Sequence, residues 1–353
     1  MEQFNNKLLV ILGPTASGKS DLAIQLAKVF NGEIVSADSR QVYIGMNIGT
    51  GKIPKDAECR ILNTEYRILN TEYYSDGIRH HLLDVISPQK SFSVAQYQKL
   101  ALKAIKNIQK RGRLPIICGG TGLYISATIE GWQLPKIKPQ EVLRQELERL
   151  TTQELFQKLK KLAPERAQTI DQNNKRRLVR ALEIILSGQT IAPLKKQPLA
   201  YDIFIIGIKR SNEELKQRIK LRLEQRLTQG MIEEIKKLKN NGVSSQRLED
   251  FGLEYRWINR YLENKVDFET MKNNLYRDIC QYAKRQMTWF TRQIFACPLR
   301  LAKQGRRACP TCLRQLESGR AKQNLDGFKK HFNTHWVSNK EEAIKLVREF
   351  FFK

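Results

Sequence analysis

The sequence has no long run of apolar residues, and this absence argues against a helix that crosses a membrane. A membrane-spanning helix needs about 20 consecutive apolar residues, and no segment of the 353-residue chain approaches that length. The amino-terminal stretch also lacks the pattern of a secretory signal, because a polar leader passes directly into a short apolar segment and a glycine-rich loop. We therefore expect a cytoplasmic protein with no membrane partner.

Cysteine and histidine are scarce, with six and four residues. The cysteines are scattered along a chain that we expect to stay in a reducing compartment, so structural disulfides are not expected. The histidines include one adjacent pair, His80 and His81. Adjacent side chains point to opposite faces of a strand, and this favours structural hydrogen bonding over a shared metal site.

Acidic residues are few relative to basic ones, 36 against 62, which gives a formal net charge of +26. The imbalance is concentrated late in the chain: residues 1–130 carry 16 Lys and Arg against 11 Asp and Glu, and residues 131–353 carry 46 against 25. A solvated basic surface is the simplest explanation of any run of charge. An excess this large and this segregated favours a polyanionic partner, and nucleic acid fits better than a membrane surface.

Short apolar runs alternate with helical patterns in the first part of the chain. Residues 7–12, 32–39 and 114–122 read as strands, and a helix is expected over residues 93–111. This alternation predicts an α/β fold with a doubly wound parallel sheet, in which ligands bind at the carboxyl ends of the strands. Together with the phosphate-binding loop described below, it predicts a P-loop NTPase-like core.

The later part of the chain is mainly helical, apart from one expected strand at residues 201–210. We therefore predict a core formed by residues 1–138 and about 200–290, with a helical insertion at 139–199. A strand and a helix are expected at 334–353.

A phosphate-binding loop follows the first expected strand. Eight consecutive residues match the pattern G-x-x-x-x-G-K-[ST]: Gly13, Pro14, Thr15, Ala16, Ser17, Gly18, Lys19 and Ser20. The glycines let backbone N–H groups surround a phosphate, Lys19 supplies a positive charge, and the Ser20 hydroxyl can hold Mg²⁺. The loop alone leaves open whether the phosphates belong to a nucleotide or to another diphosphate.

Further motifs follow this loop in a fixed order along the chain. They read GPTASGKS (13–20), DSRQVY (38–43), IGTGKIP (48–54), HHLLDV (80–85), GGTGLY (119–124), KRRLVRALEI (175–184), GLEYRW (252–257) and YAKRQMTWF (282–290). In order and approximate spacing this series resembles the tRNA dimethylallyltransferases, also called isopentenyl-tRNA transferases. The resemblance covers nearly the whole chain.

The resemblance implies that the dimethylallyl group of dimethylallyl diphosphate is transferred to the exocyclic amine of the adenosine that follows the anticodon of tRNA. In this family the phosphate loop grips the diphosphate of the donor. Asp38 would accept the proton of the weakly nucleophilic amine. Lys19, Thr15, and Ser20 with Mg²⁺ would stabilise the charge that develops on the leaving diphosphate.

The resemblance also implies residues that contact RNA. Ser39, Arg40 and Gln41 join Asp38 in contacting tRNA, and Thr121 lies where the donor and the flipped adenine meet. Positions that match tRNA contacts in the helical insertion are Arg144, Arg176, Arg177, Leu178, Val179 and Arg180. Arg222 is the best further diphosphate contact among Arg218, Arg222 and Arg226, which recur every four residues and so share one helix face.

Two stretches depart from the family pattern. The heptapeptide RILNTEY occurs in tandem at 60–66 and 67–73, which favours a local duplication in a surface loop. Residues 294–333 form an atypical basic insert that contains Cys297, Cys309 and Cys312, with His331 within it and His335 just beyond. The irregular spacing favours a loop over a zinc site, although zinc stays open.

Three alternative functions compete with the prenyltransferase interpretation. A P-loop kinase would use Asp38 as a magnesium ligand and would turn over ATP. An adenylate prenyltransferase would need no large RNA-binding segment, and a non-catalytic RNA-binding protein would not need Lys19, Ser20 and Asp38 intact. The sequence does not define which tRNAs are used. We expect a monomer, because no long heptad pattern is present.

Overall fold

The computed structural model describes residues 4, 6–56, 61–62, 70–135, 140–188, 195–197, 199–291 and 334–352. The chain divides into two compact units. One is drawn from Met1–Ile129 and Leu199–Lys353, and the other is Glu130–Pro198. The insert at 294–333, with Cys297, Cys309, Cys312 and His331, lies outside the described residues.

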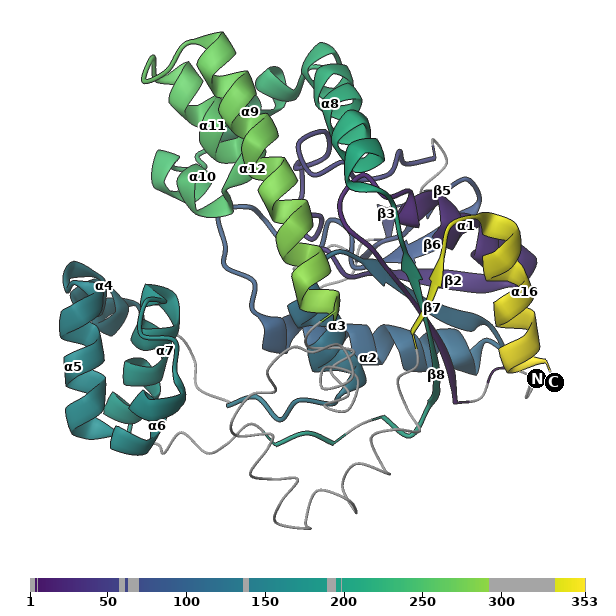
Figure 1. The fold of residues 1–353 in the computed structure, drawn as a ribbon, viewed down its shortest axis with the longest axis horizontal. Coiled ribbons are helices and arrows are strands. Elements are labelled where there is room, and N and C mark those ends of the chain that lie inside the picture. Colours follow the sequence, from purple (N-terminus) through teal and green to yellow (C-terminus); the bar gives the residue numbers. More distant parts are fainter. Residues whose placement is uncertain are drawn as a thin grey trace. The chain divides into compact units, whose positions relative to one another are not determined.

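The larger unit is built on a seven-stranded sheet in the order β5-β6-β2-β7-β1-β8-β9 (Figure 1). Neighbouring strands are parallel except β5 and β6. The strands are β1 (Lys7–Leu12), β2 (Gly32–Ser36), β5 (Tyr73–Ser75), β6 (Ile78–His81), β7 (Leu114–Gly119), β8 (Asp202–Ile208) and β9 (Thr334–Val337). The predicted α/β fold is confirmed. However, β2 and β7 end three residues earlier than expected, because the residues after them form turns.

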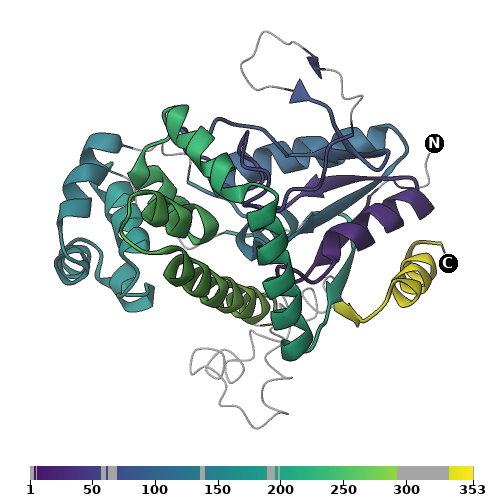
Figure 2. The same ribbon diagram turned by 90° about the horizontal axis from the view of Figure 1, so that it is seen from above.

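Helices cover both faces of this sheet. The sequence of β1 shows why both faces are buried. Its successive apolar side chains alternate, so that Leu9 and Ile11 belong to one buried cluster and Leu8, Val10 and Leu12 to the other. The first cluster includes α1 and α16, and the second includes α2 and α3; Figure 2 shows α1 and α2 on opposite sides of the sheet. Their bounds are α1 (Lys19–Val29), α2 (Val94–Lys110), α3 (Gly122–Ile129) and α16 (Lys340–Phe351).

A layer of helices follows β8 within the same unit. It consists of α8 (Asn212–Thr228), α9 (Met231–Asn240), α10 (Ser245–Phe251), α11 (Leu253–Leu262) and α12 (Phe268–Trp289). Ser211 caps α8 and Asp267 caps α12, each accepting a hydrogen bond from a backbone N–H of the first turn. Val42, Tyr43 and Met46, from the segment after β2, are buried in the core of this layer. The layer therefore packs directly on the segment that carries the DSRQVY motif.

Among its described residues the smaller unit has four helices, α4 (Glu141–Arg149), α5 (Thr152–Leu162), α6 (Pro164–Thr169) and α7 (Lys175–Leu186). Leu147, Leu155, Leu159 and Leu178 form part of its own buried cluster. A local core of this kind is what a separate compact unit requires.

Most of the RILNTEY tandem lies outside the described residues. Its described pieces form β3 (Ile61–Leu62) and β4 (Asn70–Thr71), which pair antiparallel. Among the described helices, none has the length and apolar character needed to span a bilayer.

Candidate active site

The loop from Gly13 to Ser20 connects β1 to α1 at the carboxyl edge of the parallel sheet. Ala16 and Gly18 have positive φ angles of 61° and 90°, a conformation that turns successive N–H groups toward one point. A Cβ atom on Gly13 would lie 2.8 Å from the Ser17 hydroxyl. That hydroxyl is buried and has no hydrogen-bond partner within the described part of the chain. The loop is therefore a polar cradle whose chemistry suits a phosphate group.

Positive side chains converge on this cradle. Burial lowers the pKa of Lys19, the nearby Cys118 and Asp38 oppose this effect, and Arg222 and Arg226 add to it. The pKa of Arg222 is lowered to about 10, by burial first and then by Arg226. Buried cations that lie close enough to lower the pKa of one another are stabilised when an anion binds between them.

Arginines of α8 also hold the backbone of two loops. Arg218 Nε donates to Ala16 O at 2.8 Å, Arg222 Nη2 donates to Gly51 O at 3.1 Å, and Arg226 Nη1 donates to Gly49 O at 3.3 Å. Arg226 forms a buried ion pair with Glu254 as well. A Cβ atom on Gly51 would lie 2.1 Å from Arg222 Nη2. The arginine stripe predicted on one helix face thus lies against the cradle and the 47–52 loop.

Asp38 lies two residues after the end of β2, close enough to Lys19 of the cradle to oppose the lowering of its pKa by burial. Its Oδ1 accepts hydrogen bonds from Arg40 N at 2.8 Å and Gln41 N at 3.4 Å. Ser39 N donates to Thr121 Oγ1 at 3.0 Å, and Thr121 N donates to Ala37 O at 3.0 Å. The turns after β2 and β7 are therefore joined, and Asp38 and Thr121 lie in one site.

Arg40 and Gln41 point away from Asp38 into neighbouring segments. Arg40 Nη2 donates to Asp250 O at 3.2 Å, and its guanidinium lies 5.3 Å from the centre of the Phe251 ring. Gln41 Nε2 lies 3.4 Å from each of the carbonyl oxygens of Thr50 and Gly51. These contacts fix the DSRQ segment against α10 and the 47–52 loop.

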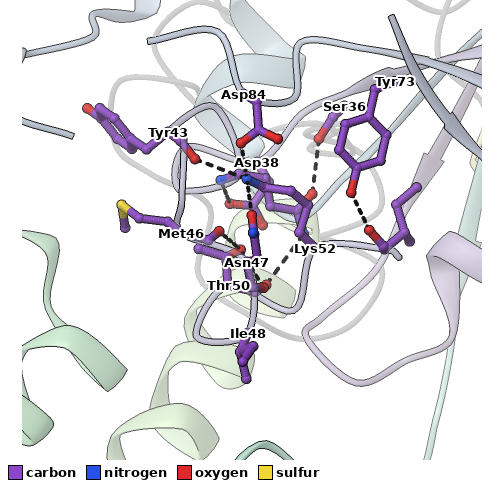
Figure 3. A network of polar contacts seen from close by, with 12 residues as sticks. Ser36, Asp38, Tyr43, Met46, Asn47, Ile48, Thr50, Lys52, Tyr73 and Asp84 are labelled. Atoms are coloured by element: carbon purple, nitrogen blue, oxygen red, sulfur yellow. Dashed lines mark hydrogen bonds and ion pairs between the residues drawn. The ribbon is translucent and has the colours of Figure 1, made fainter. Parts of the chain in front are cut away.

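The 47–52 loop, which closes this side of the site, is held by a buried lysine (Figure 3). Lys52 Nζ donates to Tyr43 O at 3.0 Å, to Asn47 Oδ1 at 2.9 Å, and to the Asp84 carboxylate. Burial lowers the pKa of Lys52, and Asp84 opposes that shift. On its other side the loop donates three backbone N–H groups, those of residues 47–49, to the Glu234 carboxylate.

Three residues of the site were not predicted from the sequence. They are Lys52, Glu234 and Gln286. Gln286 is buried on α12 and accepts a hydrogen bond from Thr15 N. For Gln286 the available signal was a polar residue that continues the buried positions of α12 after Ile279 and Ala283, since buried polar groups are normally hydrogen-bonded. Lys52 and Glu234 gave no comparable signal.

The predicted RNA-contacting residues of the helical insertion lie in the smaller unit. Arg176 and Arg177 are exposed, whereas Leu178 and Val179 are buried in its core. Arg144 and Arg180 both pair with the buried carboxylate of Glu183. Although burial raises the pKa of Glu183, hydrogen bonds from Arg144 and the Gln140 N–H lower it overall. The two arginines thus stabilise the unit as well as presenting charge.

The residues of the adjacent pair, His80 and His81, lie on opposite faces of β6. His81 Nε2 contacts Glu33 Oε2 at 2.7 Å, while His80 is buried beside Tyr73. Burial lowers the pKa of His80 to about 4, and His81 adds to this shift. His335 packs on the Phe204 ring.

The sequence predicts one magnesium ligand in the cradle, the hydroxyl of Ser20. The Ser20 hydroxyl lies in the first turn of α1, next to Lys19. Within the described ranges, no three His, Cys, Asp or Glu side chains form a metal-binding group. Magnesium commonly takes only one or two protein oxygens together with phosphate oxygens, so Ser20 suits an ion that arrives with a diphosphate.

A glycine-rich loop with its terminal lysine, placed between a parallel strand and a helix, defines an α/β protein of the P-loop type. The comparisons with known proteins narrow this class. The family described as IPP transferase matches residues 41–293. The tRNA dimethylallyltransferase of Anoxybacillus flavithermus is 42% identical over 295 residues, which cover 82% of this chain and 88% of the relative.

Solved structures agree with the sequence comparison. A tRNA isopentenylpyrophosphate transferase from Bacillus halodurans superposes with a TM-score of 0.60 at 34% identity, covering 98% of this chain and 95% of the other. A tRNA isopentenylpyrophosphate transferase from Staphylococcus epidermidis gives a TM-score of 0.57 at 30% identity and covers 97% of each chain. The chain belongs to the IPP transferase family.

Proposed function

We propose that the protein transfers the dimethylallyl group of dimethylallyl diphosphate to N6 of the adenosine on the 3′ side of the anticodon in tRNA. The products are N6-isopentenyladenosine and diphosphate. The single observation that carries this proposal is the juxtaposition, in one site, of a cationic phosphate cradle and the Asp38 carboxylate, in a chain of the IPP transferase family.

The donor side of the reaction uses the cradle and its cations. The diphosphate would accept hydrogen bonds from the loop N–H groups and lie between Lys19 and Arg222, with Thr15 as a further contact. As the bond between C1 and the bridging oxygen breaks, negative charge grows on the diphosphate and strengthens these contacts. Magnesium held by Ser20 would neutralise part of that charge.

The acceptor side uses Asp38. The adenine amine is a weak nucleophile, because its lone pair is delocalised into the ring. A carboxylate that accepts the amine proton while the bond from N6 to C1 forms lowers this barrier. Asp38 is held for this role by the N–H groups of Arg40 and Gln41, and Thr121 fixes the neighbouring residue Ser39.

The acceptor adenine has to leave the base stack of the RNA before it can react. Anticodon loops are single-stranded and therefore offer bases that can be turned out, at a cost of about a few kcal/mol. Contacts between basic side chains and phosphates offset that cost. The basic residues proposed for these contacts are Arg40, Arg144, Arg176, Arg177 and Arg180, with Ser39 and Gln41 as polar contacts. Leu178 and Val179 are buried in the core of the smaller unit and hold the arginines of α7 in place.

The direct test uses labelled dimethylallyl diphosphate with either unmodified tRNA or AMP, followed by separation of the product nucleosides. We expect label in N6-isopentenyladenosine from tRNA and none in AMP. Label in AMP alone would instead identify an adenylate prenyltransferase, and transfer to neither would contradict the proposal. Lys19→Met, which removes the cradle charge, is the matched inactive control.

A further inference from the structure

Gln286 joins two turns of the candidate active site. Its side chain is buried, with 6% of the residue exposed. Its Oε1 accepts a hydrogen bond from Thr15 N at 2.8 Å, and its Nε2 donates to Gly120 O at 2.9 Å. The first turn follows β1 and the second follows β7, two strands that are neighbours in the sheet. One amide thus bridges the phosphate cradle and the turn that carries Thr121.

The end of α12 packs tightly on the second of these turns. A Cβ atom on Gly120 would lie 2.2 Å from Gln286 Nε2, and one on Gly122 would lie 2.1 Å from the Trp289 ring. Figure 1 shows α12 running from the helical layer to α3, where these contacts occur. The two glycines therefore allow an approach that any larger residue would block, and the amide of Gln286 has little freedom to move.

The turn after β7 also holds the segment that contains Asp38. Thr121, next to Gly120, donates its N–H to Ala37 O and accepts from Ser39 N. A displacement of Gly120 would therefore move the residues on both sides of Asp38. On the other side, Thr15 belongs to the cradle, whose next residue, Ala16, is bound by Arg218.

We propose that Gln286 is a positioning residue that sets the distance between the donor diphosphate and the acceptor base, an inference that rests on the function proposed above. It acts through Thr15 and Gly120 and touches neither reacting atom. Since a misplacement of about 1 Å can slow a reaction by roughly 100-fold, loss of this bridge loosens the cradle around the diphosphate and lowers turnover even at saturating concentrations of both substrates.

Two substitutions separate positioning from simple stability. Gln286→Met keeps the volume and removes both hydrogen bonds. Gln286→Glu keeps the acceptor for Thr15 N, and it regains a donor for Gly120 O only when the carboxyl is protonated. Gln246→Met, at an exposed position of α10, is the matched control.

For Gln286→Met we expect kcat to fall about 10- to 100-fold, with the KM for tRNA within about twofold of wild type. For Gln286→Glu the deficit relative to wild type should shrink as the pH falls, because the protonated acid replaces the amide. Calorimetry with inorganic diphosphate should give about tenfold weaker binding to Gln286→Met than to wild type. Gln246→Met should change none of these values.

Wild-type kcat in both variants would overturn the proposal. A purely structural role would give a different result: kcat would fall only in proportion to a lower Tm, and the kcat deficit of Gln286→Glu would not change with pH. That result would also overturn the proposal. If wild-type protein transferred no prenyl group, the proposed function would fail. The diphosphate titration would then still decide the role of Gln286, because equal affinity in wild type and variant would contradict it.

Discussion

Asp38 is the residue on which the acceptor half of the reaction depends. Asp38→Asn keeps an oxygen that can accept from Arg40 N, so the turn should be preserved, but it cannot take up a proton. We expect single-turnover transfer to slow by about 10²- to 10⁴-fold. Asp38→Ala should lose at least as much.

Binding of tRNA to both Asp38 variants should stay close to wild type in a filter-binding assay, because many other contacts hold the RNA. Asp202→Asn is the control, because this exposed carboxylate lies at the amino end of the parallel strand β8, at the opposite edge of the sheet from Asp38. Undiminished transfer by Asp38→Ala would remove the general-base role.

At the residue scale, the sequence predicted best what is local. The cradle residues are contiguous, so their pattern alone indicated the loop and its position between a strand and a helix. Gln286 is 271 residues away from Thr15 in the sequence, and no local pattern connects them. Arg144 and Arg180 were recognised as basic positions, but their shared pairing with Glu183 depends on the packing of α4 against α7.

At the scale of elements, the 47–52 loop depends on the buried cation of Lys52. Lys52→Met leaves the Asp84 carboxylate, whose side chain is only 20% exposed, without its partner. We expect the free energy of unfolding to fall by about 1–3 kcal/mol, as measured by urea denaturation.

The double variant Lys52→Met with Asp84→Asn should recover part of that loss, since the unpaired charge is gone. Lys28→Met, which breaks the exposed pair with Asp76, should cost less than about 1 kcal/mol. An equal loss in Lys28→Met and Lys52→Met would contradict the role assigned to burial.

Glu33 on β2 makes the sheet sensitive to acid. Its carboxylate is 1% exposed and is paired with His81, Arg111 and Arg113. Although burial raises the pKa of Glu33, hydrogen bonds from His81 and Arg111 outweigh it and lower the pKa to about 2, from an ordinary value of 4.5. The charged form is favoured in the folded protein, so this contribution is complete above pH 4.5 and is lost as the pH falls toward 2.

The size of this contribution is about 3 kcal/mol. Urea denaturation of the wild type between about pH 6 and about pH 3 should show a decline in stability. Glu33→Gln should be less stable at neutral pH and should lose less on acidification. If the unfolding free energy of Glu33→Gln fell with pH as steeply as that of the wild type, the role of Glu33 in acid sensitivity would be contradicted.

The elements themselves could be predicted where periodicity is strong. The apolar run at 7–12 became β1 with the same bounds, and the helix expected at 93–111 became α2 at Val94–Lys110. The strands β2 and β7 were predicted too long, because Ala37 and Gly120 continue an apolar or small-residue run while their backbones already turn into the site. The antiparallel pairing of β5 with β6 depends on Asp76 and Gly77, whose positive φ angles of 54° and 75° form a two-residue hairpin turn. Asp-Gly is a strong signal for such a turn, and the predictions from the sequence did not use it.

At the scale of the whole molecule, the net charge of +26 bears on how tRNA is bound. Each phosphate neutralised by a basic side chain releases counterions, so the logarithm of the affinity should fall linearly with the logarithm of salt concentration. Between about 50 mM and about 200 mM salt we expect tRNA affinity to fall at least about tenfold.

The affinity for dimethylallyl diphosphate should respond less to salt, because its site is partly buried and less screened. Fluorescence anisotropy with a labelled anticodon stem-loop, compared with calorimetry of the donor, measures both responses. An RNA affinity that does not change with salt would contradict a binding surface made of basic side chains.

The most direct test of the account compares two donors on one enzyme preparation. The protein is incubated with an unmodified anticodon stem-loop and either dimethylallyl diphosphate or ATP, and both the mass of the RNA and the release of phosphate are followed. We expect a single five-carbon addition to the RNA with the first donor, abolished in Lys19→Met, and little phosphate release with ATP. Ready hydrolysis of ATP with an RNA that never gains the five-carbon group would contradict the assignment of the Gly13–Ser20 cradle to an isoprenoid diphosphate.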